Sequence, residues 1–286
     1  MARSPLICDG FVKPRAGYLL FGIIICYNYS KGIFPAGGIM KESFFRTAML
    51  LGEDAEEILG SAHVAVFGVG GVGGHCCDAL LRCGVGRLTV VDAACVKESN
   101  LNRQIVAEKA TVGMPKVEAM KRHAEAVSDA FVIPVREFVT RDNAAELIPP
   151  DADIVIDAID NVTAKLALIC ECERRGVTAL SSMGAGNRLD PTRVRVSSIK
   201  KTHTDPLSRV IRKELRERGV GDVTVCWSEE PPRAPLFEAP DAEARRQTPG
   251  SVPFVPAAFG LALASEAVRL ILEKRREENE IRNIQQ

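Results

Sequence analysis

The sequence predicts a doubly wound, Rossmann-like α/β fold with a mostly parallel sheet and an elaborated C-terminal part. Short, continuously apolar segments alternate with helical segments from about residue 60 to 185, which is typical of parallel strands covered on both faces. The first apolar segment leads into a glycine loop at residues 68–73, as it does in that fold. The alternation ends after this region, so the remainder is expected to elaborate the same domain.

The predicted elements follow in order along the chain. Two short amphipathic helices are expected from residue 44 to 59, broken near Gly52. Apolar runs predict strands at 64–67, 88–92, 131–135, 153–157 and 177–180, and the intervening segments predict helices at 72–83, 116–127 and 162–175. The first of these helices is followed by Gly84, a residue type that often ends helices.

The second half departs from this alternation. Strands are expected at 193–199 and 223–227, on either side of a basic helix at 205–218. Residues 229–250 are rich in Pro, Ala and charge, which predicts a mobile loop, and a closing amphipathic helix follows at 257–273. Residues 43–275 are therefore expected to form one domain, followed by a charged tail at 276–286.

Residues 1–42 are expected to be an extension that is disordered or lies upstream of the native start. Lys13 and Arg15 precede an apolar run at 17–26 that is too short to span a bilayer. The extension is either a targeting segment or an upstream stretch with Met40 as the true start. We favour the second, since the nucleotide site predicted below would work in the cytoplasm, and no membrane partner is expected.

The amino-acid composition excludes few classes of function, but the cysteines bear on whether the protein binds a metal. The 37 basic residues balance the 37 acidic residues, so net charge does not indicate a nucleic-acid partner. The nine cysteines include no Cys-x-x-Cys pair, which argues against a structural zinc site. Their odd number and irregular spacing favour reduced thiols over a disulfide framework.

The glycine loop and a following acid predict a nucleotide site. Glycines 68, 70 and 73 have the G-x-G-x-x-G spacing between a strand and a helix, where Gly68, Gly70, Gly71 and Gly73 let the backbone approach phosphates at a helix N-terminus. Asp92 ends the next strand, where an acid binds ribose hydroxyls. A tight turn without a ligand is the alternative. By itself the motif would favour an NAD-dependent oxidoreductase.

Fixed charges downstream favour ATP and adenylation instead. Arg103 and Lys116 follow the ribose-binding acid, and Asp160 follows the strand at 153–157. A dehydrogenase has no need of such cations, whereas attack on an ATP α-phosphate concentrates negative charge. Arg103, Lys116 and a magnesium ion held by Asp160 would offset that charge.

These residues resemble the ubiquitin-activating-enzyme superfamily and its bacterial sulfur-carrier adenylyltransferases. The resemblance is carried by Ser99-Asn100-Leu101-Asn102-Arg103-Gln104, by Gly113-Met114-Pro115-Lys116 and by Asp157-Ala158-Ile159-Asp160-Asn161. It implies that Asn100 contacts the nucleotide, that Arg103 and Lys116 bind phosphate and that Asp160 binds magnesium. It also implies a homodimer in which Arg46 reaches the neighbouring subunit's ATP site. Ala94 stands where relatives often carry a second acid, so weaker ribose contacts are expected.

The second half resembles one branch, the tRNA threonylcarbamoyladenosine dehydratases. The similar blocks are residues 182–192, 200–207, 209–216 and 250–256. Seven basic and three acidic residues lie between positions 200 and 218, and a helix there would place several of the basic side chains on one face. The alternative to an RNA-binding surface is a helix face that is simply exposed to solvent. The residues expected to contact tRNA are Lys200, Lys201, Arg209, Arg212, Lys213 and Arg216.

The resemblance implies an ATP-dependent ring closure. The threonylcarbamoyl carboxylate on tRNA adenosine 37 would attack the α-phosphate, and the carbamoyl group would then displace AMP within the same molecule, so no enzyme nucleophile is required. Cys226, in an apolar strand, is expected to be a buried structural thiol, and His203 a bystander. ATP, Mg²⁺ and a monovalent cation are the expected cofactors, and a sulfur-relay protein is a further expected partner. The alternatives are activation of a ubiquitin-like sulfur carrier, an NAD-dependent oxidoreductase and a non-catalytic nucleotide-binding module.

Overall fold

The computed structural model describes residues 40–237 and 249–285 of the chain. The chain divides into two compact units, Met1–Gly52 and Glu53–Gln286. The described part of the first unit contains the 3-10 helix η1 (Glu42–Phe44) and helix α2 (Phe45–Leu51), which ends at Gly52 with a positive φ of 100°. The break predicted near Gly52 is thus confirmed, whereas the extension predicted at 1–42 lies almost wholly outside the described residues.

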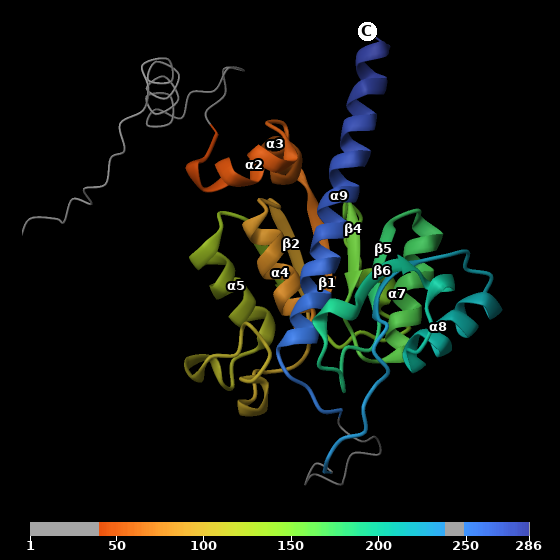
Figure 1. Ribbon diagram of the computed structural model, residues 1–286. Coiled ribbons are helices and arrows are strands. Elements are labelled where there is room, and N and C mark those ends of the chain that lie inside the picture. Colours follow the sequence, from red (N-terminus) through yellow and green to blue (C-terminus); the bar gives the residue numbers. More distant parts are fainter. Residues whose placement is uncertain (1–39, 238–248, 286) are drawn as a thin grey trace, which may run out of the picture. The chain divides into compact units, whose positions relative to one another are not determined.

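The second unit is built on a seven-stranded sheet (Figure 1). Its strands are β1 (His63–Phe67), β2 (Arg87–Val91), β3 (Phe131–Val135), β4 (Ile154–Asp157), β5 (Thr178–Ser182), β6 (Val194–Ser198) and β7 (Thr224–Ser228). They lie in the order β3-β2-β1-β4-β5-β7-β6, and every neighbouring pair is parallel except β6 and β7. The predicted doubly wound α/β fold is confirmed, and the elaboration adds β7 and, beyond it, the edge strand β6.

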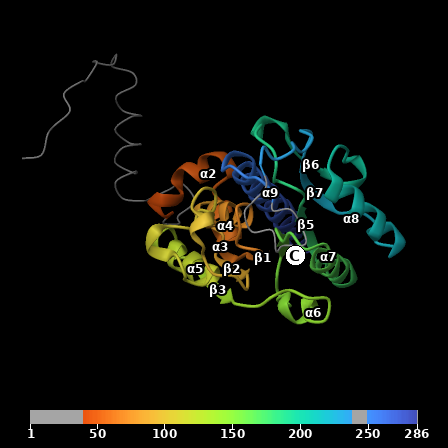
Figure 2. The same cartoon turned by 90° about the horizontal axis from the view of Figure 1, so that it is seen from below.

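Helices cover both faces of this sheet (Figure 2). The α-helices of this unit are α3 (Ala55–Ser61), α4 (Gly73–Arg82), α5 (Lys116–Val127), α6 (Ala144–Leu147), α7 (Val162–Arg175), α8 (Pro206–Glu217) and α9 (Phe254–Ile284). Short 3-10 turns are η2 (Glu98–Asn100), η3 (Lys109–Thr111), η4 (Pro191–Arg193) and η5 (Ile199–Lys201). Figure 2 shows α4, α5 and α9 on one side of the strands and α6, α7 and α8 on the other.

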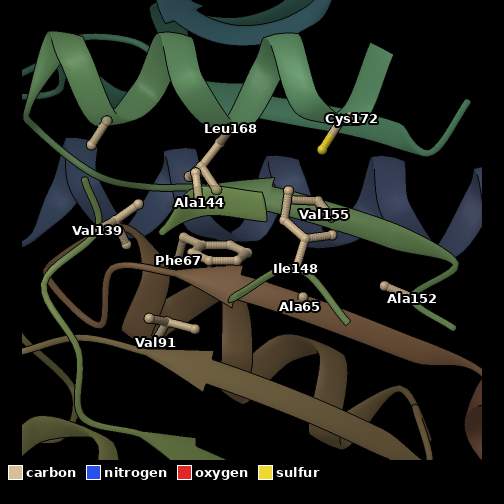
Figure 3. Close-up of a cluster of buried hydrophobic side chains, with 11 residues drawn as sticks. Ala65, Phe67, Val91, Val139, Ala144, Ile148, Ala152, Val155, Leu168 and Cys172 are labelled. Atoms are coloured by element: carbon tan, nitrogen blue, oxygen red, sulfur yellow. The ribbon is translucent and has the colours of Figure 1, made fainter. Parts of the chain in front are cut away.

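The core on the α7 side explains how the carboxyl ends of the strands are held. Phe67 of β1 packs in one buried cluster with Leu168 and Cys172 of α7 (Figure 3). A second cluster joins α7 and α8 to the outer strands through Ile211 and Trp227, among others. Since β1 and β4 are completely or almost completely buried along their length, their apolar runs are those of central strands.

The C-terminal helix is longer than the sequence predicted. α9 spans 31 residues, from Phe254 to Ile284, so most of the expected tail at 276–286 is helical. Ion pairs within the helix, such as Arg269 with Glu266 and Glu273, and a pair between Arg276 and Asp54 support the polar part. α9 is long and apolar enough to cross a membrane by those two criteria, but 56% of the relevant window is buried within the protein, as in a core helix.

The loop predicted at 229–250 lies only partly within the described residues. Positions 229–237 are irregular, and positions 238–248 lie outside the part that the structure describes. The described ends of the loop meet at Asn187, which has a positive φ of 60°. Asn187 donates its backbone N–H to the Gly250 carbonyl, and its own carbonyl accepts from the Arg233 N–H.

Close packing of α9 on α4 fixes the helix that begins at the glycine loop. A Cβ added to Gly260 would lie 2.4 Å from the Val72 carbonyl oxygen and 2.8 Å from the Cys76 backbone nitrogen. Backbone atoms cannot yield as a flexible side chain can. Glycine at this position therefore lets α9 press directly on the first turn of α4.

Replacing Gly260 with Ala should destabilise the protein by about 1–3 kcal/mol through overpacking against α4. The matched control is Gly60→Ala, because a Cβ at Gly60 meets nothing within 4 Å and alanine favours helix. Urea unfolding of the two variants measures the difference. Equal midpoints for both variants would contradict the packing argument.

Candidate active site

A cleft of about 760 Å³ opens at the carboxyl ends of β1, β2 and β4. Strand order reverses there, because β2 and β4 leave β1 on opposite sides, and ligands of doubly wound sheets bind at such a point. The cleft is lined by Gly68, Gly70, Gly71, Asp92, Asn100, Arg103, Lys116 and Asp160, which are all predicted nucleotide-site residues. Gly73 is buried behind them at the start of α4.

The glycine loop is shaped by close backbone contacts. Gly68 has a φ of 93°, and a Cβ there would lie 2.7 Å from the Ala158 carbonyl oxygen. At Gly73 an added Cβ would lie 1.8 Å from the Gly68 carbonyl oxygen, so only glycine fits. A Cβ at Gly70, in contrast, would meet nothing within 4 Å. The turn is therefore closed towards the protein and open at Gly70, as a phosphate-binding turn must be.

Asp92 holds the glycine loop as well as lining the cleft. Its Oδ2 accepts a hydrogen bond of 2.8 Å from the Val69 N–H, and its Oδ1 accepts one of 2.8 Å from the Ala94 N–H. The Lys116 Nζ lies 3.8 Å from Asp92 Oδ2. Lys116 thus sits beside the acid predicted for the ribose, and its positive charge faces the same part of the cleft.

Arg103 is positioned by its neighbours. Its Nη1 donates to the Ser99 carbonyl over 2.9 Å and to Asn102 Oδ1 over 2.8 Å. The Asn102 Nδ2 donates in turn to the Ser251 carbonyl over 2.9 Å. Ser251 lies just beyond the loop at 229–250, so a contact 149 residues away along the chain helps to hold the predicted phosphate-binding arginine.

Two amide side chains follow one another along this wall of the cleft. Asn100 is 8% exposed, and its Oδ1 accepts from the Lys97 N–H, which closes the turn η2. Gln104 is 7% exposed, and its Oε1 is buried without a hydrogen-bond partner among the described residues. An orphaned acceptor is costly unless a ligand donates to it. Gln104 was not among the predicted site residues, although it belongs to the motif that contains Arg103.

A buried ion pair supports the loop that carries Asp160. Lys165 of α7 is fully buried, and its Nζ lies 2.6 Å from Asp157 Oδ2 and 2.8 Å from the Ser182 carbonyl. The other Asp157 oxygen accepts from the Ile159 N–H. Asp160 follows directly and is exposed in the cleft. Lys165 was not among the predicted site residues, and its only signal in the sequence is a lysine within an otherwise apolar stretch of helix.

The predicted Arg46 lies in the other unit. It is an exposed residue of α2, and its role at a neighbouring subunit's site stays a prediction. Among the described residues there is also no group of three or more His, Cys, Asp or Glu side chains that would form a ready-made metal site. Asp160 is therefore a candidate ligand for a metal ion that phosphates would also coordinate.

The basic residues of the second half divide into two kinds. Five of the six predicted tRNA contacts are exposed: Lys200, Lys201, Arg209, Lys213 and Arg216. Arg212 is half-buried, and its Nη1 donates to the carbonyls of Ile199 and Thr202. Arg212 therefore ties η5 to α8, which differs from the purely surface role predicted for it.

The second half offers no accessible thiol for covalent chemistry among its described residues. Cys226 is buried in β7, and burial raises its pKa well above the usual range of a thiol. Its predicted character as a buried thiol is confirmed. His203 is exposed, with its ring 4.6 Å from that of Trp227 in an edge-to-face contact.

Comparison with known proteins shows the family to which this chain belongs. Residues 44–286 match the ThiF family. The chain belongs to the ThiF family. Within it, the chain is 38% identical over 244 residues to a tRNA threonylcarbamoyladenosine dehydratase of Bacillus subtilis, an alignment that covers 82% of this chain and 96% of the relative.

Solved structures of a ThiF-family relative agree with this assignment. Crystal structures of the Escherichia coli tRNA N6-threonylcarbamoyladenosine dehydratase in complex with AMP and with ATP superpose with TM-scores of 0.76 and 0.75. Sequence identity is 34%, and the alignments cover 82% of this chain and 96% of the relative. The resemblance inferred from the sequence motifs is thus confirmed.

Because Asn102 helps to position Arg103, substitutions of Asn102 should lower kcat by different amounts. Asn102→Ala removes both the acceptor for Arg103 and the donor to Ser251, whereas Asn102→Asp keeps the acceptor alone. Because one hydrogen bond contributes about 0.5–1.5 kcal/mol, we expect the alanine variant to lose up to about tenfold in kcat and the aspartate variant to lose less. Pyrophosphate release at saturating substrates measures this order. Equal kcat values in all three proteins would contradict the positioning role.

Proposed function

We propose that this chain is an ATP-dependent tRNA threonylcarbamoyladenosine dehydratase that works through an acyl-adenylate. The observation that carries the proposal is the cleft, which unites Asp92, Arg103, Lys116 and Asp160 around an open glycine turn in a chain whose relatives bear that name. The substrate is tRNA with threonylcarbamoyladenosine at position 37. The products are the cyclic form of that nucleotide, AMP and pyrophosphate.

ATP occupies the cleft with its phosphates at the glycine turn. The N–H groups near Gly70 and the N-terminus of α4 face the phosphates, and Asp92 faces the ribose. Ala94 leaves Asp92 as the acid of this segment for the ribose, so the predicted weaker ribose contacts remain an expectation. Arg103 lies against the glycine turn, since a Cβ at Gly71 would be 3.5 Å from its Cγ, and it is the cation for the departing pyrophosphate.

The first step joins the substrate carboxylate to the α-phosphorus. A carboxylate oxygen attacks, the bond from the α-phosphorus to the bridging oxygen breaks, and pyrophosphate leaves with the electron pair. Arg103 and Lys116 oppose the negative charge that develops, and preorganised cations of this kind lower the barrier. Asp160 would hold Mg²⁺ together with the ATP phosphates, and the ion would supply further charge neutralisation.

The second step closes the ring within the substrate. The carbamoyl nitrogen or oxygen attacks the activated carbonyl carbon, AMP leaves, and the attacking group loses its proton. An intramolecular attack has a high effective molarity, so the chain need only hold the acyl-adenylate and exclude water. The burial of Cys226 agrees with a route that uses no covalent enzyme intermediate.

Several parts of the assembly belong to the same proposal. The chain works as a homodimer in which Arg46 completes the partner's ATP site, and it acts in the cytoplasm. A monovalent cation is a further cofactor of this proposal, and a sulfur-relay protein is a further partner. Activation of a ubiquitin-like carrier remains the competing adenylation reaction, and an assay with both acceptors separates the two.

AMP release should require ATP, Mg²⁺ and modified tRNA together. Asp160→Ala should lower kcat by about 100-fold or more while the unfolding midpoint stays unchanged, because removal of a group that stabilises the transition-state charge has effects of this size. Chromatographic detection of AMP and of the cyclic nucleoside tests both points. AMP release with a carrier protein but not with modified tRNA would overturn the proposal.

The exposed arginines and lysine on α8 should contribute to tRNA affinity. Arg209→Ala with Arg216→Ala removes two residues seven positions apart on one helix face, and the logarithmic salt dependence of binding should flatten by about 1 for each phosphate that is no longer neutralised. Arg122→Ala, at an exposed position of α5, is the control for removal of a positive charge. Unchanged affinity and slope in the double variant would identify this face as merely solvated.

A further inference from the structure

We propose that a second groove, between α7 and α8, binds the single-stranded RNA that adjoins the nucleotide in the cleft. The proposal rests on the proposed function, which supplies a polynucleotide substrate. The groove has a volume of about 700 Å³, close to that of the cleft. α7 and α8 lie side by side on one face of the sheet (Figures 1 and 2), and a shared buried cluster fixes their spacing.

The groove is continuous with the cleft along two chain segments. Residues 137–139 line the cleft, and Arg141, two positions further on, lines the groove. Residues 159–161 likewise line the cleft, and Val162 and Thr163 line the groove. The two hollows are therefore lined by neighbouring positions of the same two segments.

The position of the groove also fits the direction from which the acceptor must arrive. The glycine loop, Asp92 and Lys116 place ATP over β1, β2 and β3. The groove lies beside α7 and α8, which cover the other half of the sheet. A target nucleotide within a tRNA loop brings covalently attached neighbours, so these must lie on a surface that adjoins the cleft.

The lining suits unstacked bases and phosphates. Val210 of α8 supplies apolar surface, being 45% exposed, and Val162 of α7 is partly exposed beside it, whereas Leu166 is 6% exposed and belongs to the buried cluster beneath. Single-stranded RNA is recognised through unstacked bases, which can stack on guanidinium planes such as those of the arginines that border the groove. An apolar groove between two helices would also suit a peptide, so the charges decide between the two.

Three arginines and the two glutamates Glu173 and Glu214 border the groove, and the excess of positive charge favours a polyanion. Arg174 and Arg218 pair with Glu171 and Glu214, whereas Arg141 forms no ion pair among the described residues. Arg141 is exposed and stands at the junction of groove and cleft. An unpaired arginine at the entry to the reaction site is well placed for the phosphate next to the target nucleotide.

A charge-reversal pair at one position tests the occupant. Val210→Glu and Val210→Lys remove the same apolar surface but introduce opposite charges. For an RNA occupant, the glutamate variant should raise the KM for modified tRNA by about tenfold or more, since a carboxylate in the groove repels the RNA phosphates. The lysine variant should stay within about threefold of the unchanged protein, because its charge compensates by attracting phosphate.

Arg141 provides an independent variant that is exposed and outside the core. Arg141→Glu should raise the KM for modified tRNA by at least as much as Val210→Glu, with kcat at saturation and ATP affinity unchanged. The measurements are AMP release against tRNA concentration and ATP binding by calorimetry. Should Val210→Glu fail to fold, Arg141→Glu and Val210→Lys carry the test.

The outcomes separate this proposal from the function on which it rests. Equal rises in the KM for modified tRNA in Val210→Glu and Val210→Lys would show that the groove does not respond to charge, and would overturn an RNA occupant whose phosphates it attracts. Unchanged KM values in Val210→Glu and Arg141→Glu, with normal turnover of modified tRNA by the unsubstituted protein, would overturn the groove and leave the dehydratase assignment standing. Absence of turnover in the unsubstituted protein would overturn both.

Discussion

The buried ion pair between Lys165 and Asp157 is the interaction on which both hollows of this protein depend. It joins the end of β4 to the first turns of α7, and through the Ser181 hydroxyl and the Ser182 carbonyl it reaches β5. Burying two charges is costly, and removal of one partner leaves the other uncompensated. The pair is therefore poor evidence of stability but strong evidence that this geometry matters. Asp160 on one side and the outer face of α7 on the other both take their positions from it.

At the glycine loop, backbone contacts hold the structure in place of a buried ion pair. Gly68 donates its N–H to the Val91 carbonyl, and Asp92 accepts from Val69, so β1, its turn and β2 close around one carboxylate. Gly260 lets α9 press on the helix that follows the turn. The phosphate end of the cleft is thus rigid because it is backbone packed on backbone, and rigid donors need no reorganisation during phosphoryl chemistry.

Sequence alone predicted most of the sheet and the composition of the cleft, for physical reasons. Fully buried parallel strands read as apolar runs, and the helices at 116–127 and 162–175 and the strand at 131–135 were predicted with the bounds that the structure has. Contacts between distant positions left no such pattern. Neither the bond from Asn102 to Ser251 nor the partner of Lys165 can be read from spacing, and Arg212 resembled its exposed neighbours until its carbonyl acceptors were known. α9 was predicted too short because the helix beyond residue 273 is polar and exposed, with ion pairs such as Arg275 with Glu278 and Arg276 with Asp54 in place of apolar periodicity.

The two halves of the sheet differ in how they prepare for their ligands. The half of β1, β2 and β3 presents glycines, one acid and buried amides, which suits a ligand of fixed shape such as ATP. The half of β4, β5 and β7 presents exposed basic side chains and an apolar groove, which tolerate a larger and more variable polymer. Asn102 joins the halves, because it touches Arg103 with its oxygen and Ser251, beyond the inserted loop, with its nitrogen. Arg103, which lies against the glycine turn, is thereby held in part by a segment 149 residues away along the chain.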